Sequence, residues 1–219
     1  AYEIPKRDWS SDVCSSDLGT AHALLTTAPV LAHRTGTLVL LSGDVPALTA
    51  GTLTTLAATH ARARAAATVV TAQVADPRGY GRIVRDGAAL ARIVEDRDAT
   101  PLERDIHEIN AGIYAFDLAG LFEAVRRIGA ANAQREYYLP DLVAIYRSEG
   151  RVVETVTVAD PDEILGINSR ADLASVGRLL RRRKNAALMA AGVTLEDPDS
   201  TFIDMDVQVG ADTIIKPGV

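Results

Sequence analysis

The residues with the clearest chemical potential surround Asp44. Asp44 follows the apolar run at residues 38–41, which Ser42, Gly43 and Pro46 bring to an end. Such a run predicts a strand buried on both faces, of the kind found in parallel sheets covered by helices. Ligands of open α/β sheets bind at the C-terminal ends of strands, so a carboxylate here is placed to hold a cation beside a phosphate. The alternative is a helix cap, because Asp after a strand is a common helix start.

A second stretch with chemical potential is the loop Asp76-Pro77-Arg78-Gly79-Tyr80-Gly81. Two glycines around a tyrosine, directly after Asp-Pro, predict a tight loop in which the main chain can approach a ligand closely. By itself the pattern indicates only a turn.

The elements that must position these residues alternate along the chain. After the strand at 38–41, residues 49–65 have the apolar spacing of a helix, and the β-branched residues 67–72 predict the next strand. Strand, helix and strand in this order predict a right-handed parallel crossover. The remaining pattern predicts helices at 20–32, 118–128, 139–147 and 170–189 and strands at 91–95, 109–116 and 152–158. We therefore expect an α/β fold.

Composition limits the class of protein. With 219 residues, 47% hydrophobic and 24% charged, the chain is large enough for one sizeable core and is not of the disordered class. A net charge of -6 provides no basic surface for nucleic acid, and the basic run at 178–184 is expected to form a solvated helix face. The single cysteine, Cys14, excludes an internal disulfide and suits a cytoplasmic location. No apolar run approaches the roughly 20 residues that span a bilayer, so no membrane partner is expected.

Both ends of the chain differ from the rest. Residues 1–17 are rich in Ser and Asp and have no period, and we expect them to be a non-native or disordered segment. Residues 193–219 carry apolar residues about every six positions with Gly beside them, which is the spacing of hexapeptide β-helix coils. A solenoid needs several coils to bury its core, so we expect the chain to be truncated within the β-helix.

Seven stretches in a fixed order carry a family resemblance. They are LGTAHA at 18–23, GDVPAL at 43–48, DPRGYGRIVR at 76–85, IVEDRDAT at 93–100, EINAGIYAFD at 108–117, NAQREYYLPD at 132–141 and GINSR at 166–170. In this order and spacing the chain resembles the bifunctional N-acetylglucosamine-1-phosphate uridylyltransferase / glucosamine-1-phosphate acetyltransferase family. The resemblance implies a Rossmann-like nucleotidyltransferase sheet with helices on both faces over residues 18–192, followed from residue 193 by a left-handed β-helix.

The resemblance also implies the reaction and its cofactor. UTP and N-acetylglucosamine 1-phosphate would give UDP-N-acetylglucosamine and pyrophosphate, with Mg2+ as the metal. Asp44 matches the family's metal-binding Asp and Asn168 its Asn partner. The missing C-terminal part would use acetyl-CoA, and the full-length protein is expected to be a homotrimer.

The other matched positions divide between the two substrates. Gly19 and Thr20 should contact uracil, whereas Gly81, Glu95 and Asn110 should hold the amino sugar, with Glu136 and Tyr138 completing that pocket. The alternatives are a helix cap for Thr20, a surface carboxylate for Glu95, a sheet-edge amide for Asn110 and a core aromatic for Tyr138.

Three departures from the family pattern limit the expected activity. The family's Gly-rich loop L-A-x-G-x-G-T-R-M and the Lys after it have no counterpart, its Gln-x-x-Gln falls at Cys14 and Asp17, and Ser42 stands where Tyr is common. We therefore expect this polypeptide to be a fragment with little or no uridylyl transfer. The competing interpretations are another sugar-1-phosphate nucleotidyltransferase and a non-catalytic β-helix scaffold protein.

Overall fold

The computed structural model describes residues 18–219, so the expectations for residues 1–17, including Cys14 and Asp17, lie outside the described part. The described residues form two compact units. Unit 1 contains residues 18–42 and 50–159, and unit 2 contains residues 43–49 and 160–219. Each unit is described by itself.

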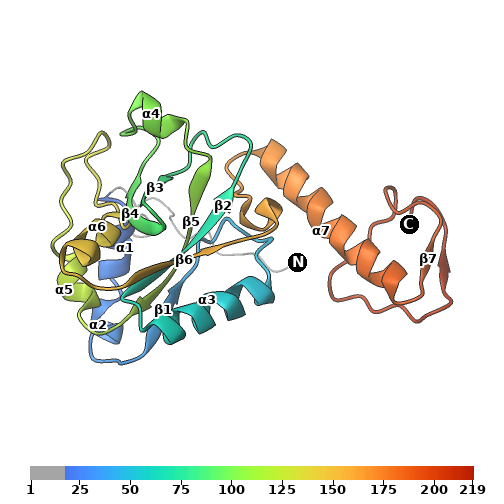
Figure 1. The fold of residues 1–219 in the computed structure, drawn as a ribbon. Helices are drawn as coiled ribbons and strands as arrows, with labels where there is room; N and C mark the ends of the chain where they lie inside the picture. The colour runs from blue at the N-terminus through green and yellow to red at the C-terminus, as the bar shows by residue number, and fades with distance from the viewer. Residues whose placement is uncertain (1–17) are drawn as a thin grey trace, which may run out of the picture. The chain divides into compact units, whose positions relative to one another are not determined.

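A mixed sheet forms the centre of unit 1 (Figure 1). Its strands are β1 (Thr37–Leu40), β2 (Ala67–Gln73), β3 (Arg82–Asp86), β4 (Ala89–Val94), β5 (Glu108–Asp117) and β6 (Val153–Thr157). The order is β4-β3-β5-β2-β6, with β1 also paired to β5. Only β2 and β6 pair in parallel, and the other pairs are antiparallel.

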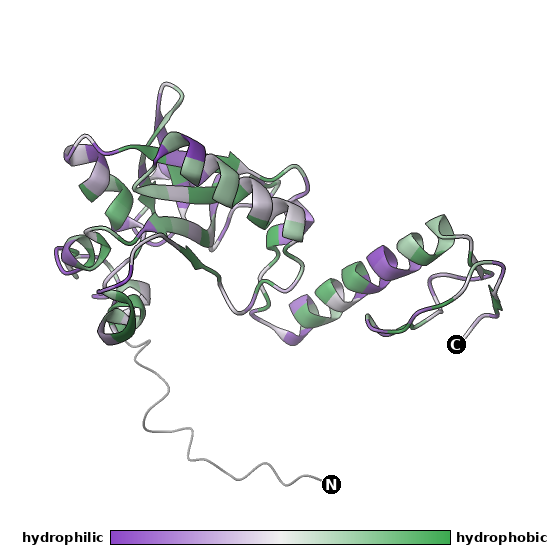
Figure 2. Ribbon diagram, turned by 90° about the horizontal axis from the view of Figure 1, so that it is seen from below, coloured by the Kyte–Doolittle hydropathy of each residue, from purple (hydrophilic) through white to green (hydrophobic). Residues whose placement is uncertain are grey.

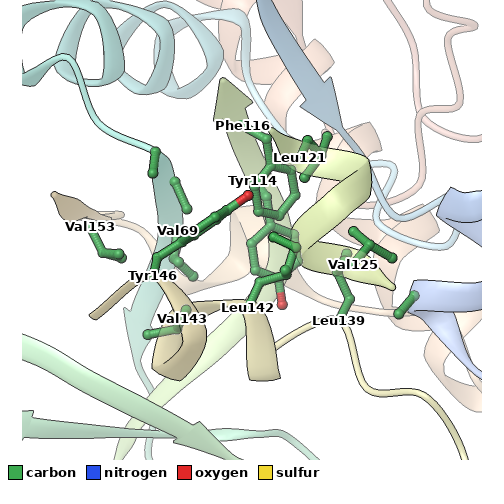
Figure 3. Close-up of a cluster of buried hydrophobic side chains, with 14 of the residues drawn as sticks. Val69, Tyr114, Phe116, Leu121, Val125, Leu139, Leu142, Val143, Tyr146 and Val153 are labelled. Atoms are coloured by element: carbon green, nitrogen blue, oxygen red, sulfur yellow. The ribbon is translucent and has the colours of Figure 1, made fainter. Parts of the chain in front are cut away.

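Helices cover both faces of this sheet. They are α1 (Thr20–Leu25), α2 (Ala28–Leu31), α3 (Ala50–Ala63), α4 (Pro101–Arg104), α5 (Leu121–Val125) and α6 (Asp141–Ser148). On one face, Tyr114 and Phe116 of β5 stack at 5.3 Å between ring centroids within a core that includes Leu142 and Tyr146 of α6 (Figure 3). α3 packs against β2, β5 and β6, and its buried His60 bonds to Thr68 of β2. Side chains alternate between faces along a strand, so neighbouring residues of β2 serve the two cores.

The prediction that residues 38–41 form a strand buried on both faces of a parallel sheet is wrong. β1 pairs antiparallel with β5, and Val39 is 40% exposed and Leu41 50% exposed. Among residues 18–219 no strand pairs with the second edge of β1. The apolar side chains of β1 line an open groove. β1 and β2 are parallel to each other, as predicted, but β5 lies between them because both pair with it.

Two predicted helices are shorter in the structure. The helix expected at 20–32 is divided into α1 and α2, and Pro29 lies in the first turn of α2. Proline has no N–H and its ring clashes with the carbonyl four residues earlier, so the helix restarts here. The helix expected at 118–128 is limited to α5. The hairpin strand β3 and the short helix α4, which a capping box of Thr100 and Glu103 begins, were not predicted.

Unit 2 is built on the helix α7 (Arg170–Ala190), which follows the 3-10 helix η2 (Pro161–Ile164). Ser169 caps α7 by accepting a bond from the Asp172 N–H. After α7, β7 (Thr194–Leu195) pairs in parallel with β8 (Ile214–Ile215). A small core of Leu188, Val193 and Leu195 lies beside them. The β-helix expected here stays a prediction, because two short strands do not define a solenoid.

The basic run of α7 does more than face solvent. Its residues form the hydrophilic middle of the helix (Figure 2). Arg183 donates to the Ala47 carbonyl at 2.6 Å and pairs with Asp160 at 2.9 Å. Lys184 donates to the carbonyls of Met205 and Val207. These two side chains therefore hold other segments of unit 2 against the helix.

Candidate functional site

Three predicted sugar ligands lie together in unit 1. A Cβ atom added to Gly81 would lie 3.2 Å from Glu95 Oε1 and 3.5 Å from Asn110 Cβ. The main chain joins the same residues, because the Asn110 N–H donates to the Gly81 carbonyl at 2.8 Å. The structure therefore brings a bare backbone, a carboxylate and an amide to one place, which are groups that bond to sugar hydroxyl and acetamide groups.

The strand register explains why these residues meet. Arg82, the first residue of β3, is paired with Val94 at the end of β4 and with Ile109 near the start of β5. Gly81 precedes Arg82, Glu95 follows Val94 and Asn110 follows Ile109. Each predicted ligand is thus one residue away from the same rung of the sheet.

Asn110 is buried, and its side chain is already bonded within the chain. Its Nδ2 donates to the Tyr114 hydroxyl at 2.7 Å, and its Oδ1 accepts from the Gly112 N–H at 3.1 Å. A carboxamide has two N–H donors and two acceptor lone pairs, so one of each stays available for a ligand. The internal bonds fix the orientation of the amide rather than use up its capacity.

Glu95 and Tyr138 line a cavity of about 380 Å3, together with Asp98, Asn132 and Asp141. Burial, followed by the carboxylates of Asp141 and Asp98, raises the pKa of Glu95. Burial and the carboxylates around it raise the pKa of Tyr138 to about 12, so its hydroxyl is neutral at physiological pH. The structure therefore places Tyr138 with Glu95, as the pocket prediction requires.

The predicted uracil contacts lie against the segment that contains Glu136. Gly19 has φ +93°, and a Cβ there would lie 2.7 Å from the Tyr137 carbonyl oxygen and 2.9 Å from Glu136 Cβ. The Tyr137 N–H donates to the Leu18 carbonyl at 2.8 Å. Only glycine allows these two stretches of chain to approach so closely.

Thr20 is the first residue of α1 but does not cap it through its side chain. Its Oγ1 accepts a bond from the Leu139 N–H at 3.2 Å, so its hydroxyl proton stays available for a ligand. The helix-cap alternative for Thr20 therefore has no support in the hydrogen bonds of α1.

Two residues that the sequence did not single out organise the loop before Tyr138. Asn132 accepts from the N–H groups of Gln134 and Glu136 and donates to the Glu136 carbonyl. Asp98 accepts from the Ala133 N–H at 2.9 Å. For Asn132 a sequence signal exists, because Asn side chains tend to bond to main-chain N–H groups two residues onward. The bond of Asp98 joins residues 35 positions apart and has no such local signal.

The predicted metal ligands lie together in unit 2. A Cβ added to Gly166 would lie 3.6 Å from Asp44 Oδ2 and 3.4 Å from Asn168 Nδ2. The Ile167 N–H donates to the Asp44 carbonyl at 2.9 Å, which ties the two segments together. Both side chains are exposed, so a solvated cation and its phosphate ligands have access to them.

This pair has the donor chemistry of a magnesium site with few protein ligands. Within residues 18–219 no group of three or more His, Cys, Asp or Glu side chains is arranged to hold a metal. Mg2+ usually takes one or two carboxylates and completes its shell with water and substrate phosphates. A carboxylate and an amide on either side of a residue without a side chain fit that requirement.

The mixed sheet, the helices on both faces and the polar groups at the strand ends define an α/β protein of the nucleotide-binding kind. The model of the nucleotidyl transferase family matches residues 8–157, and the chain belongs to this family. No helix among the described residues has the length and apolar character needed to cross a membrane.

Curated relatives agree with the resemblance drawn from the motifs. The chain is 50% identical over 205 residues to a protein of Syntrophotalea carbinolica named Bifunctional protein GlmU, covering 94% of this chain and 44% of that protein. A protein of the same name from Pelotomaculum thermopropionicum is 51% identical over 93% of this chain and 45% of its own length. The chain thus spans less than half the length of these relatives.

A solved structure supports the fold alone. A Bacillus anthracis protein described as a glucose-1-phosphate thymidylyltransferase in complex with a sucrose has a TM-score of 0.56 at 19% identity. The likeness covers 74% of this chain and 60% of that one. It agrees with the α/β fold of the chain.

Proposed function

We propose that this chain holds most of the site for uridylyl transfer from UTP to N-acetylglucosamine 1-phosphate, with UDP-N-acetylglucosamine and pyrophosphate as products. By itself the 219-residue chain should show little or no turnover, because it has no counterpart of the family's Gly-rich loop and Lys. An oxygen of the sugar phosphate attacks the α-phosphorus of UTP, and the bond from that phosphorus to the oxygen bridging to the β-phosphate breaks. Pyrophosphate leaves with the bonding electrons. The attacking phosphate is already ionised, so no general base has to remove a proton.

The main task of the protein in this reaction is to position two anionic substrates. In the proposal the Gly81 N–H, the Glu95 carboxylate and the Asn110 amide hold the amino sugar. Glu136 and Tyr138 complete that pocket. Glu95 accepts from sugar hydroxyl groups in its ionised form, whereas the Tyr138 hydroxyl, which donates its proton to Gln134 Oε1 at 2.8 Å, offers an acceptor lone pair to the sugar.

Gly19 and Thr20 are assigned to the uracil ring. The main chain at Gly19 and the free hydroxyl proton of Thr20 are suited to the edge of a base. Asp44 and Asn168 would hold Mg2+, which supplies charge neutralisation at the phosphates when it is bound. The acetyl transfer, the acetyl-CoA substrate and the homotrimer implied by the resemblance stay predictions.

The observation that carries the proposal is the convergence of Gly81, Glu95 and Asn110. These residues come from three separate stretches of the sequence that match the family, and the resemblance assigns each of them to the sugar. The family membership supports nucleotidyl transfer, and the name shared by the relatives supports the bifunctional family. Neither identifies the base or the sugar.

Calorimetry with the 219-residue chain tests the proposal. Product binding is the readout because no Gly-rich phosphate loop followed by Lys occurs in the 219 residues of this chain. We expect UDP-N-acetylglucosamine with Mg2+ to bind more tightly than UDP-glucose or the thymidine analogue. Asp44→Asn should remove the effect of Mg2+, whereas Asp206→Asn, at an exposed carboxylate of the same unit, should not. Tighter binding of the thymidine compound would replace the proposal with another sugar nucleotidyltransferase, and no binding of any would support a scaffold.

A further inference from the structure

Arg82 is a buried charge that the proposed reaction does not use. Its residue is 1% exposed and lies between Gly81 and Ile83, which are also buried. Placing a guanidinium group in a protein interior costs several kcal/mol unless it is paired and bonded. An apolar residue would fit the start of a buried strand better, so the position requires an explanation.

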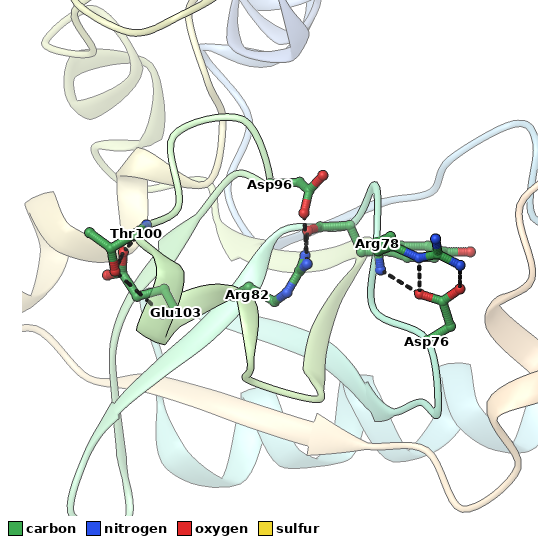
Figure 4. A network of polar contacts seen from close by, with 7 residues as sticks. Asp76, Arg78, Arg82, Asp96, Thr100 and Glu103 are labelled. Carbon is green, nitrogen blue, oxygen red and sulfur yellow. Dashed lines mark hydrogen bonds and ion pairs between the residues drawn. The ribbon is translucent and has the colours of Figure 1, made fainter.

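The contacts of Arg82 supply one. Its Nη1 donates to the Tyr80 carbonyl, and its Nη2 pairs with Asp96 Oδ1 at 2.7 Å (Figure 4). Tyr80 directly precedes Gly81, and Asp96 directly follows Glu95. One guanidinium group therefore holds the chain neighbours of two predicted sugar ligands.

The bonds of Arg82 lie at the end of the pairing between β3 and β4. The pair Arg82 and Val94 is the last rung of β3 and β4 on this side. Gly81 and Glu95 lie just beyond it, where the ladder of these two strands no longer fixes their positions. A guanidinium group is planar and has several N–H donors in a rigid arrangement, so it is suited to join the segment before β3 to the segment after β4.

We propose that Arg82 is a positioning residue that fixes Gly81 and Glu95 for the sugar phosphate by joining the Tyr80 carbonyl to the Asp96 carboxylate. This inference rests on the proposed function, because it assumes that Gly81 and Glu95 contact the sugar. Arg82 itself is not assigned a contact with substrate.

The charges around Glu95 give Arg82 a second effect on the same ligand. Glu95 is surrounded by Asp96 and Asp98 from the loop after β4, Asp141 from α6 and Arg82 from β3. Burial, and after it the three aspartates, raise the pKa of Glu95, and Arg82 lowers it. Arg82 therefore favours the ionised carboxylate, which accepts hydrogen bonds from sugar hydroxyl groups.

A purely structural role in the β3–β4 hairpin is the alternative, and a matched pair of variants separates the two. Arg82→Met removes the bonds and the charge, whereas Arg82→Lys keeps the charge. Arg85→Met is the control, because Arg85 lies on the same strand and its ion pair with Glu108 at 2.5 Å does not flank a sugar ligand. All are compared as folded proteins, checked by circular dichroism.

Calorimetry with N-acetylglucosamine 1-phosphate and with UTP gives the first readout. We expect Arg82→Met to weaken sugar phosphate binding about 10- to 100-fold, the order of loss that a small misplacement of binding groups causes. Affinity for UTP and all affinities of Arg85→Met should be unchanged. Combining Arg82→Met with Glu95→Gln should weaken binding no further than the stronger single variant. Equal losses from Arg82→Met and Arg85→Met, or losses that add, would overturn the positioning role.

A ligand-free readout keeps the inference separate from the proposed function. Carboxyl NMR of the free chain should show a higher Glu95 pKa in Arg82→Met than in wild type, with Arg82→Lys close to wild type. Hydrogen exchange of the Asn110 N–H, which bonds to Gly81, should be faster in Arg82→Met than in Arg85→Met. An unchanged Glu95 pKa and unchanged exchange would refute the inference. Failure of the wild-type chain to bind N-acetylglucosamine 1-phosphate would instead overturn the proposed function.

Discussion

Replacing Gly19 with alanine tests the contact between the predicted uracil segment and the chain at residues 136–137. Gly19 has φ 93° and ψ 172°, a region of the backbone that is essentially restricted to glycine. The added Cβ would also lie 2.7 Å from the Tyr137 carbonyl oxygen and 2.9 Å from the Tyr137 nitrogen. These are main-chain atoms, so no side-chain rotation relieves the overlap.

The expected loss of stability has two parts. Backbone strain at such a position costs about 1–3 kcal/mol. Overpacking against a well-packed neighbour costs about another 1–3 kcal/mol. We therefore expect Gly19→Ala to lower the free energy of unfolding of unit 1 by about 2–6 kcal/mol, and each kcal/mol corresponds to roughly 2–4 °C in Tm for a protein of this size.

Gly36→Ala is the matched control. Gly36 also has a positive φ of +113°, but an added Cβ would meet no atom within 4 Å. Its loss should come from the backbone alone, at about 1–2 kcal/mol. Urea unfolding followed by circular dichroism, with hydrogen exchange of β5 to report on unit 1, measures both variants. If Gly19→Ala is no less stable than Gly36→Ala, the close packing of residues 136–137 on Gly19 is refuted.

Three further predictions concern other parts of the chain. Gly166→Ala should weaken Mg2+ binding in calorimetry at a stability cost below about 1 kcal/mol, because its Cβ would enter the space between the metal ligands at ordinary contact distance. Burial lowers the pKa of His60, so the unfolded chain binds the proton more readily and stability should fall as pH decreases below about 6.5. His60→Gln should lose that part of the pH dependence in urea unfolding. Arg85→Met should cost about 1.5–3 kcal/mol by removing the two hydrogen bonds of Arg85 to the Glu108 carboxylate, whereas Arg78→Met, at an exposed ion pair, should leave stability close to that of wild type; thermal unfolding compares the two.

The local residue pattern predicted the helices and strands better than it predicted which strands pair with each other. The β-branched run predicted β2 and the apolar period predicted α7, each close to the bounds seen in the structure. For β1, four apolar residues in a row indicated a strand but wrongly indicated burial on both faces. Pairing depends on residues far away in the sequence, here on β5, and no periodicity within residues 38–41 carries that information.

The candidate site was predicted through family motifs, and its supporting residues were not. Gly81, Glu95 and Asn110 were assigned together because each lies in a matched stretch. Arg82 shares a matched stretch with Gly81, and Asn132 shares one with Glu136 and Tyr138. Neither was predicted to support the site, because an Arg or Asn is most often exposed. In the structure Arg82 is buried and bonds to Tyr80 and Asp96, the chain neighbours of two predicted ligands.

One glycine lies in each of the three predicted binding regions, for uracil, for the sugar and for the metal. The physical reason for glycine differs between them. Gly19 needs glycine twice, for its positive φ and for the contact with residues 136–137. Gly81 and Gly166 have no positive φ, so the backbone alone would accept alanine. At Gly166 the space a Cβ would take is bordered by Asp44 and Asn168 at ordinary contact distance, whereas at Gly81 it is bordered by Ile93 at 3.1 Å as well as by Glu95 and Asn110. Gly166→Ala should therefore lower ligand affinity more than stability. Gly81→Ala should lower both, because the buried Ile93 side chain has to move as well.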